Sequence, residues 1–317
     1  MVTLAGLVAG ALLALHGGGR VTVAQPARSP SPPVQLRSPF TGEPVRALRR
    51  VLAVKIDNIG YARPQTGLTG ADIVYVLPVE GGLSRFLAVF SSHYPPVVGP
   101  VRSAREDDLE LLAQFGRPAF AYSGATATLL PYIQRTARIV NLYSGITPGY
   151  YRDTTRIAPY NLYARTRPLL AQARAASKAH GIGFRFAPPP PGGTARRSAA
   201  VSYPAASFRF TWSAAKRGWL VSMDGAPATT TGGGRLAPAT VVIQHTTVRT
   251  SRFLEYGKPP PYAESTGSGT ALVLRDGKAW TTHWSRPNAN AGTTYTTASG
   301  QPMTFTPGQV WVILAPR

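Results

Sequence analysis

Charged side chains lie at the ends of the most apolar runs of this sequence, where binding and catalytic sites commonly form. Asp57, Glu80 and Arg85 are the first of these, and Arg102 and Arg105 follow a Gly-Pro turn. A guanidinium binds phosphate or carboxylate through two parallel hydrogen bonds, whereas two neighbouring carboxylates can act as general acid and general base. The pattern therefore indicates either an anion-binding site or a hydrolytic site.

Polar residues at or beyond predicted strand ends are expected to share one pocket. The members of this set are Asp57, Asn58, Arg63, Gln65, Glu80, Arg85, Arg102, Ser103, Arg105, Arg152, Asp153, Arg156 and Asn161. Our preferred interpretation is a non-catalytic protein whose arginine-lined pocket binds an anionic group. The alternative is a hydrolase of a glycan or a phosphodiester that uses Asp57, Glu80 or Asp153. A third interpretation is purely structural: Asp57, Glu80 and Asp153 would neutralise buried arginines and bind no ligand, as charged pairs at loop junctions often do.

A helix is predicted directly after the two arginines of the Gly-Pro turn. Ser103 followed three residues later by Glu106 has the spacing of a capping box, which predicts a helix over about 104–115 that ends before Gly116. Acidic residues in the first turn of such a helix complement its dipole. The capping box and the acidic first turn therefore explain the helix start without a ligand. They do not explain why Arg102 and Arg105 stand beside it.

Short apolar runs bounded by glycine and proline predict buried strands in the first half of the chain. They cover residues 51–56, 73–77, 86–90, 119–122 and 139–142. Helices are predicted at 125–135 and at 166–180, where Pro168 lies in the first turn and Gly181 follows the end. Strands and helices mixed in this way indicate an α+β fold with mixed α/β layers.

The second half of the chain has no useful helical period and is predicted to be mostly antiparallel β. Its predicted strands are 208–212, 218–223, 240–245, 295–297, 303–305 and 310–314. Asp276-Gly277 inside the apolar run 272–280 predicts a two-residue hairpin. Trp280, Trp284 and Trp311 are expected in the core, with a sugar-stacking surface as the alternative.

Composition divides the chain into four parts. They are a signal-like apolar segment with a Pro-rich linker (1–39), a larger N-terminal α/β domain (40–187), a Pro/Gly linker (188–198) and a smaller β-rich domain (199–317). Residues 2–15 are uncharged, too short for a comfortable membrane span, and typical of a secretory signal core. We therefore expect an extracytoplasmic protein, secreted or held at the membrane by an uncleaved N-terminal segment. The sequence has no cysteine, which excludes disulfides and lipid attachment at cysteine.

The charge of the chain is strongly one-sided, with 34 Lys and Arg against 13 Asp and Glu and a formal net charge of +21. Such a field attracts anionic polymers, lipids and nucleic acid. Because the signal-like segment argues against nucleic acid, we expect an anionic cell-envelope partner: a polymer, a lipid head group or a glycan. No phosphate loop or dinucleotide motif occurs and the five histidines lack ligand spacing, so neither a cofactor nor a metal is expected.

A series of short motifs occurs in a fixed order along the chain. They are VKIDN at 54–58, ARPQTGL at 62–68, ADIVY at 71–75, VEGG at 79–82, RFLAVF at 85–90, GPVRSAR at 99–105, YRD at 151–153, APYNLY at 158–163, GSG at 267–269 and GQVW at 308–311. The series resembles the bacterial YerB-like family of envelope lipoproteins, a domain family of unknown function. The resemblance implies a larger N-terminal α/β part and a smaller C-terminal part, with no defined activity.

The sequence departs from this family's pattern in two places. The cysteine that carries the lipid in many members is absent, which argues against a lipid anchor. Tyr160 stands where a histidine is common, which weakens any general-base role at that position.

Overall fold

The computed structural model describes residues 35–255 and 257–317. The predicted signal-like segment and nearly all of the predicted Pro-rich linker fall within residues 1–34 and lie outside this part. Within the described part, no helix has both the length and the apolar character needed to cross a membrane.

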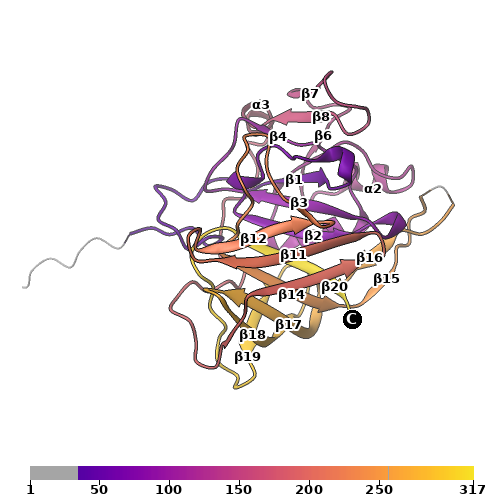
Figure 1. The fold of residues 1–317 in the computed structure, drawn as a ribbon. Helices are drawn as coiled ribbons and strands as arrows, with labels where there is room; N and C mark the ends of the chain where they lie inside the picture. The colour runs from indigo at the N-terminus through magenta and orange to yellow at the C-terminus, as the bar shows by residue number, and fades with distance from the viewer. Residues whose placement is uncertain (1–34, 256) are drawn as a thin grey trace, which may run out of the picture. The chain divides into compact units, whose positions relative to one another are not determined.

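One mixed sheet of eleven strands contains strands from both halves of the chain (Figure 1). In spatial order these are β19 (Thr294–Thr297), β18 (Lys278–Arg286), β17 (Gly267–Arg275), β14 (Thr240–Thr246), β20 (Val310–Pro316), β2 (Ile73–Pro78), β3 (Ser84–Phe90), β1 (Leu52–Asp57), β5 (Ala119–Tyr122) and β6 (Val140–Tyr143), and β9 (Thr194–Ala195) pairs with β18. The predicted two-domain division stays a prediction, but the second half of the chain extends the sheet of the first.

Strand β20 makes this connection. It runs parallel to both β2 and β14, so that Val312 lies between Tyr75 on one side and Val242 on the other. All three residues are buried. Continuous apolar runs are typical of strands that are covered on both faces, which explains why these strands occupy the middle of the sheet.

Further strands and helices cover the two faces of the large sheet. A four-stranded sheet of β10 (Ser198–Tyr203), β11 (Ala206–Ser213), β12 (Gly218–Met223) and β13 (Ala226–Pro227) packs on one face with α3 (Thr166–Gln172) and the small sheet of β4 (Val97–Val98), β8 (Leu162–Arg165) and β7 (Tyr150–Arg152). The other face carries α1 (Glu106–Leu112), α2 (Leu129–Arg135), the 3-10 turn η4 (Ala113–Phe115) and the pair β15 (Val248–Thr250) and β16 (Pro261–Ala263). Three more 3-10 turns are η1 (Gly60–Ala62), η2 (Leu68–Gly70) and η3 (Glu80–Gly82).

Alternate residues of β1 illustrate how the sheet is buried on both sides. Val54 belongs to the cluster that includes Phe208 of β11 and Trp311 of β20. Its neighbour Ala53 belongs to the opposite cluster, with Leu112 of α1. Since side chains alternate between the faces of a strand, β1 presents buried apolar side chains on both faces, and both faces are covered.

The fold is mostly β with few helices, so the predicted α+β class is only partly right. Most strands lie where the apolar runs predicted them, and the Asp276-Gly277 hairpin is confirmed by the pairing of Arg275 with Lys278. The predicted strand at 303–305 is wrong, since only an isolated bridge joins Phe305 to Phe186.

Two helices differ from their predicted lengths for tertiary reasons. The helix predicted over 166–180 ends at Gln172, because the Arg50 guanidinium donates hydrogen bonds to the carbonyl groups of Leu170 and Ala173. The chain beyond it returns to the sheet, where the Val51 N–H donates to the carbonyl of Ser177. The helix predicted over 125–135 begins only at Leu129.

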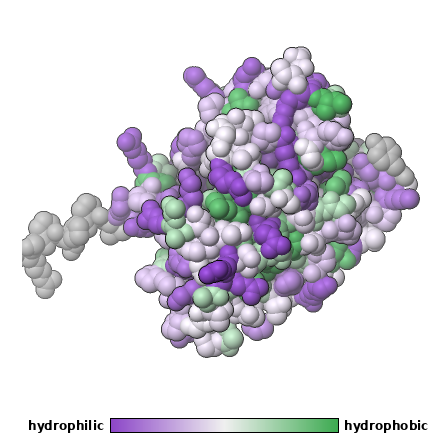
Figure 2. All heavy atoms as spheres, viewed as in Figure 1, coloured by the Kyte–Doolittle hydropathy of each residue, from purple (hydrophilic) through white to green (hydrophobic). Residues whose placement is uncertain are grey.

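On the face drawn in Figure 2, hydrophilic residues predominate and hydrophobic ones form small separate patches. The core tryptophan prediction is confirmed, because Trp280, Trp284 and Trp311 are all buried. They are therefore not available as a sugar-stacking surface.

Replacing Trp311 by alanine should destabilise the whole protein rather than one half of it. Its fully buried ring packs against Phe86 of β3 and Phe210 of β11. Loss of a buried aromatic side chain costs about 3–5 kcal/mol. Urea unfolding followed by circular dichroism should show a lower midpoint in a single transition, with a smaller shift for half-buried Trp212→Ala. Two separated transitions in W311A would contradict this expectation.

Candidate functional site

A cavity of about 510 Å³ lies where β1 and β2 end and β3 begins. Its lining residues are Asp57, Ile59, Val79, Glu80, Leu83, Ser84, Arg85, Arg102, Arg105, Tyr160, Glu255 and Lys258. Five of the residues predicted from strand ends therefore share one cavity. We call it the arginine cavity.

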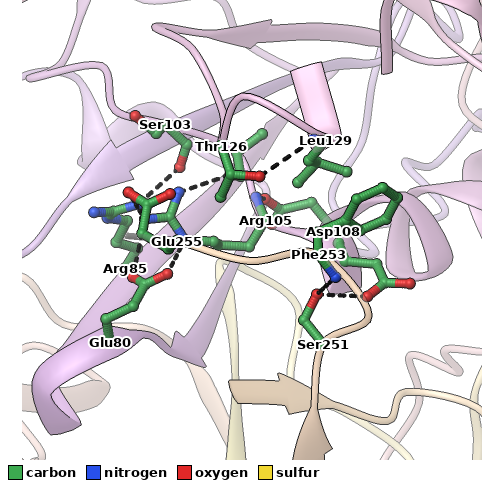
Figure 3. Close-up of polar contacts among 12 residues, drawn as sticks. Glu80, Arg85, Ser103, Arg105, Asp108, Thr126, Leu129, Ser251, Phe253 and Glu255 are labelled. Carbon is green, nitrogen blue, oxygen red and sulfur yellow. Dashed lines mark hydrogen bonds and ion pairs between the residues drawn. The ribbon is translucent and has the colours of Figure 1, made fainter. Parts of the chain in front are cut away.

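Arg105 and Glu80 form a bidentate ion pair at one wall of the arginine cavity (Figure 3). The Nε atom of Arg105 lies 2.6 Å from Oε1 of Glu80, and its Nη2 atom lies 2.9 Å from Oε2. Nη2 of Arg105 also lies 3.7 Å from Oε1 of Glu255. Although burial alone would raise the pKa of Glu80, the hydrogen bonds and the charge of Arg105 lower it below its usual range.

Arg85 stands beside this pair and lacks a carboxylate of its own. Its side chain is only 9% exposed, and Nη1 donates a 3.0 Å hydrogen bond to the carbonyl of Ser103. Its buried Nε atom has no hydrogen-bond partner, and no described residue forms an ion pair with it. Burial and the neighbouring charges of Arg105 and Arg102 lower the pKa of Arg85 to about 10, so it remains charged at neutral pH.

Arg102 and Asp57 form the second ion pair of the arginine cavity. Nε of Arg102 lies 2.9 Å from Oδ2 of Asp57, and Oδ1 of Asp57 accepts the N–H of Asn58. The Arg102 guanidinium lies over the ring of Tyr160, 5.6 Å from its centroid, and Tyr160 stacks on Tyr61. Tyr160 thus lines the cavity as a packing partner of an arginine.

The turn that carries Arg102 and Arg105 is fixed by a fully buried ion pair. Nζ of Lys55 lies 2.6 Å from Oδ1 of Asp108, and neither side chain is exposed. Oδ2 of Asp108 accepts the N–H of Arg105, and the Lys55 carbonyl accepts the N–H of Arg102. The adjacent Asp107 is also buried, and burial together with the Asp108 carboxylate raises its pKa.

The predicted capping box of Ser103 and Glu106 is wrong. The helix begins at Glu106, and the carboxylate that caps it belongs to Asp108, which receives the N–H of Arg105. Glu106 instead accepts the hydroxyl of Ser251 and pairs with Arg252. The capping pattern occurs two residues later than predicted, with an arginine in place of the usual serine.

Three other predicted site residues hold loops together instead of lining the arginine cavity. Nη2 of Arg63 donates to the Asn58 carbonyl at 2.7 Å, and Nη1 pairs with Asp224 at 2.8 Å. Fully buried Gln65 donates to the carbonyl of Asp57 and to the side chain of Asn58. Asn58 in turn donates to Ser84, which lines the arginine cavity, so this network supports one of the cavity's lining residues.

The predicted residues of the 152–161 segment do not enter the arginine cavity. Arg152 donates to Asn161 at 2.7 Å and, together with Arg102 and Ser103, lines a neighbouring cavity of about 370 Å³. Arg156 binds the Tyr163 hydroxyl and loop carbonyls. Asp153 is partly exposed, and hydrogen bonds from Thr155 lower its pKa.

Sequence reasoning did not place Tyr160, Glu255 or Lys258 in this site, although Tyr160 lies within the APYNLY motif. Glu255 and Lys258 come from the second half of the chain, and only the tertiary fold brings them to residues more than 150 positions earlier. Within residues 35–255 and 257–317, no group of three or more His, Cys, Asp or Glu side chains is arranged to hold a metal ion.

The motif series and the fold agree on the family of this protein. Residues 40–180 match the N-terminal domain, and residues 199–312 the C-terminal domain, of the family described as protein of unknown function (DUF3048). The chain belongs to this family, which confirms the resemblance noted from the motifs.

Two comparisons lead to one relative within the family. Over 75 residues, the chain is 51% identical to the "Putative lipoprotein YerB" of Bacillus subtilis (strain 168), a stretch that spans 23% of this chain and 23% of the relative. The crystal structure of the YerB protein from Bacillus subtilis matches with a TM-score of 0.75 and 23% identity. The match covers 89% of this chain and 97% of that one, and it shows a shared fold.

Replacing Arg105 by glutamine should raise the pKa of Glu80. The carboxylate would lose its bidentate partner while remaining partly buried, and burial disfavours the charged form. Carboxyl-carbon NMR should show Glu80 titrating below its usual pKa in the parent protein and above that position in R105Q. Exposed Arg209→Gln is the matched control and should leave the titration in place.

The same pair makes stability depend on pH. Because the folded-state pKa of Glu80 is lowered, the pair stabilises the fold above the unfolded pKa of about 4.3. This stabilisation disappears as the pH falls through the lower folded pKa. R105Q should therefore unfold with less acid dependence than the parent, and equal acid dependence in both would contradict the assignment.

Proposed function

We propose that this protein is a non-catalytic binding protein of the bacterial cell envelope, and that the arginine cavity takes an anionic group of an envelope component. Arg85 carries the proposal. Its guanidinium is nearly buried, is charged at neutral pH and forms no ion pair with a described residue. The nearby Asp57 and Glu80 carboxylates offset part of the cost of burying this charge, and a bound anion would offset more of it. It faces a cavity large enough for a small ligand.

The charges of the cavity support an anion rather than a cation. Arg102 is paired with Asp57, and Arg105 is shared between Glu80 and Glu255. Among the lining residues, three carboxylates balance the three arginines, and exposed Lys258 gives the cavity one net positive charge. Arg85 is the one of these arginines that forms no ion pair with a described residue. A phosphate or carboxylate in the cavity would complete the charge balance and receive hydrogen bonds from Arg85.

The same geometry makes the hydrolase alternative weaker. A general acid needs a carboxyl group whose pKa is raised towards neutrality. The pKa of Glu80 is lowered, and Asp57 is held by Arg102. Asp153 lies at an exposed turn outside the arginine cavity. If the protein hydrolysed a glycan or a phosphodiester and Asp57→Asn abolished that activity, the hydrolase interpretation would be supported instead.

The envelope location rests on three independent features. The relative from Bacillus subtilis carries the name of a lipoprotein. The sequence begins with a signal-like apolar segment, and its net charge of +21 suits anionic polymers and lipid head groups.

The test is phosphate binding by full-length protein and by the variant Arg85→Met, measured by calorimetry with inorganic phosphate. Methionine keeps much of the side-chain volume and removes the charge. Hydrogen bonds to a charged group contribute about 1.5–3 kcal/mol, so binding should weaken at least about tenfold. Arg85→Lys, which keeps the charge, should retain part of the affinity.

Arg209→Met is the matched control, since exposed Arg209 lies on β11 and its loss lowers the net charge equally. It should leave phosphate affinity nearly unchanged. Equal weakening in R85M and R209M would indicate non-specific attraction to a basic surface, and the cavity would then not be the binding site.

A further inference from the structure

An apolar groove of about 680 Å³ adjoins the arginine cavity. The two hollows share Val79, Glu80 and Lys258 as lining residues. The groove continues from η3 between the turn that joins β10 to β11 and the pair β15 and β16. A molecule that enters the arginine cavity therefore has an adjoining surface along which to extend.

Proline is the most frequent residue type in the lining of this groove. Pro78, Pro204, Pro259, Pro261 and Pro316 all contribute to it. Proline has no N–H to donate and presents a ring of hydrocarbon. Such a lining suits a chain that makes no hydrogen bonds.

Three polar residues of the groove are engaged elsewhere, and Lys258 lies at the end that the groove shares with the arginine cavity. The Tyr203 hydroxyl donates to the carbonyl of Leu314 at 2.9 Å, and Glu80 is paired with Arg105. Arg249 lies over the ring of Tyr262 and pairs with a glutamate. Few polar groups remain to recognise a polar ligand, which favours an apolar one.

The position of the groove depends on a glycine in the turn beside the arginine cavity. Gly82 has a φ of 70°, and a Cβ atom there would lie 2.6 Å from Cβ of Pro204. Its carbonyl accepts the N–H of Ala205 at 2.9 Å. This close approach places the β10–β11 turn against η3 and so sets the groove next to Arg85.

We propose that the bound molecule is an anionic lipid with a phosphate head group, with its head in the arginine cavity and one hydrocarbon chain in the apolar groove. The assignment rests on the proposed anion site and adds the class of ligand. Its basis is charge complementarity at Arg85 combined with a proline-lined surface that begins at the same residues.

The experiment measures binding of methyl, butyl and octyl phosphate to full-length protein by calorimetry, below the micelle concentration of each. A fully buried methylene strengthens binding about fourfold, and an open groove retains about half of that free energy. Octyl phosphate should therefore bind at least about tenfold more tightly than butyl phosphate. Inorganic phosphate and methyl phosphate report on the head-group site alone.

Pro259→Asn places a neutral polar side chain at an exposed position of the groove without altering the charge of the arginine cavity. It should reduce the ratio of octyl phosphate affinity to butyl phosphate affinity at least about threefold and leave methyl phosphate affinity unchanged. Pro189→Asn, at an exposed proline outside the groove, is the matched control and should change neither.

The outcomes separate the two proposals. Arg85-dependent phosphate binding with no gain from chain length would overturn the lipid assignment and leave the anion site standing. A gain that P259N and P189N affect equally would also overturn it, because the chain would then lie elsewhere. Absence of any Arg85-dependent binding would overturn both.

Discussion

The buried ion pair between Lys55 and Asp108 is the constraint on which the site depends. Its atoms lie 2.6 Å apart with neither side chain exposed, so losing one partner would leave an uncompensated charge in the core, at a cost of about 3–5 kcal/mol. Through Asp108 the pair sets the start of α1, and through its backbone Lys55 holds Arg102. The positions of Arg102 and Arg105 are therefore fixed by a buried ion pair between the sheet and helix α1.

The three arginines of the arginine cavity differ in whether a carboxylate is paired with them. Two of its three arginines are held by carboxylates, which fixes their guanidinium planes before any ligand arrives. Arg85 is held by one carbonyl hydrogen bond and retains a free donor edge. Preorganised neighbours around one unsatisfied group are the arrangement by which a protein lowers the entropic cost of binding a small anion.

Local patterns predicted most strands and five of the twelve residues that line the arginine cavity, and tertiary contacts decided the rest. Asp57, Glu80 and Arg85 meet because they lie at the facing ends of adjacent strands, a relation that strand-end reasoning captures. Gln65 and Arg156 have equally promising residue types, yet loop carbonyls engage them, and residue type alone does not reveal such partners. Similarly, the helix expected over 166–180 stops where Arg50 binds its carbonyl groups, an interaction across 120 residues.

The placement of β20 has a consequence for how the chain reaches its native state. Ile73 pairs with Val310, so the contacts in the middle of the sheet join residues separated by almost the entire described sequence. A high contact order slows folding, because the entropy of closing long loops is lost before the sheet gains its central hydrogen bonds. Until β20 pairs with β2, the outer edge of the three strands β2, β3 and β1 therefore has no partner in the described sheet.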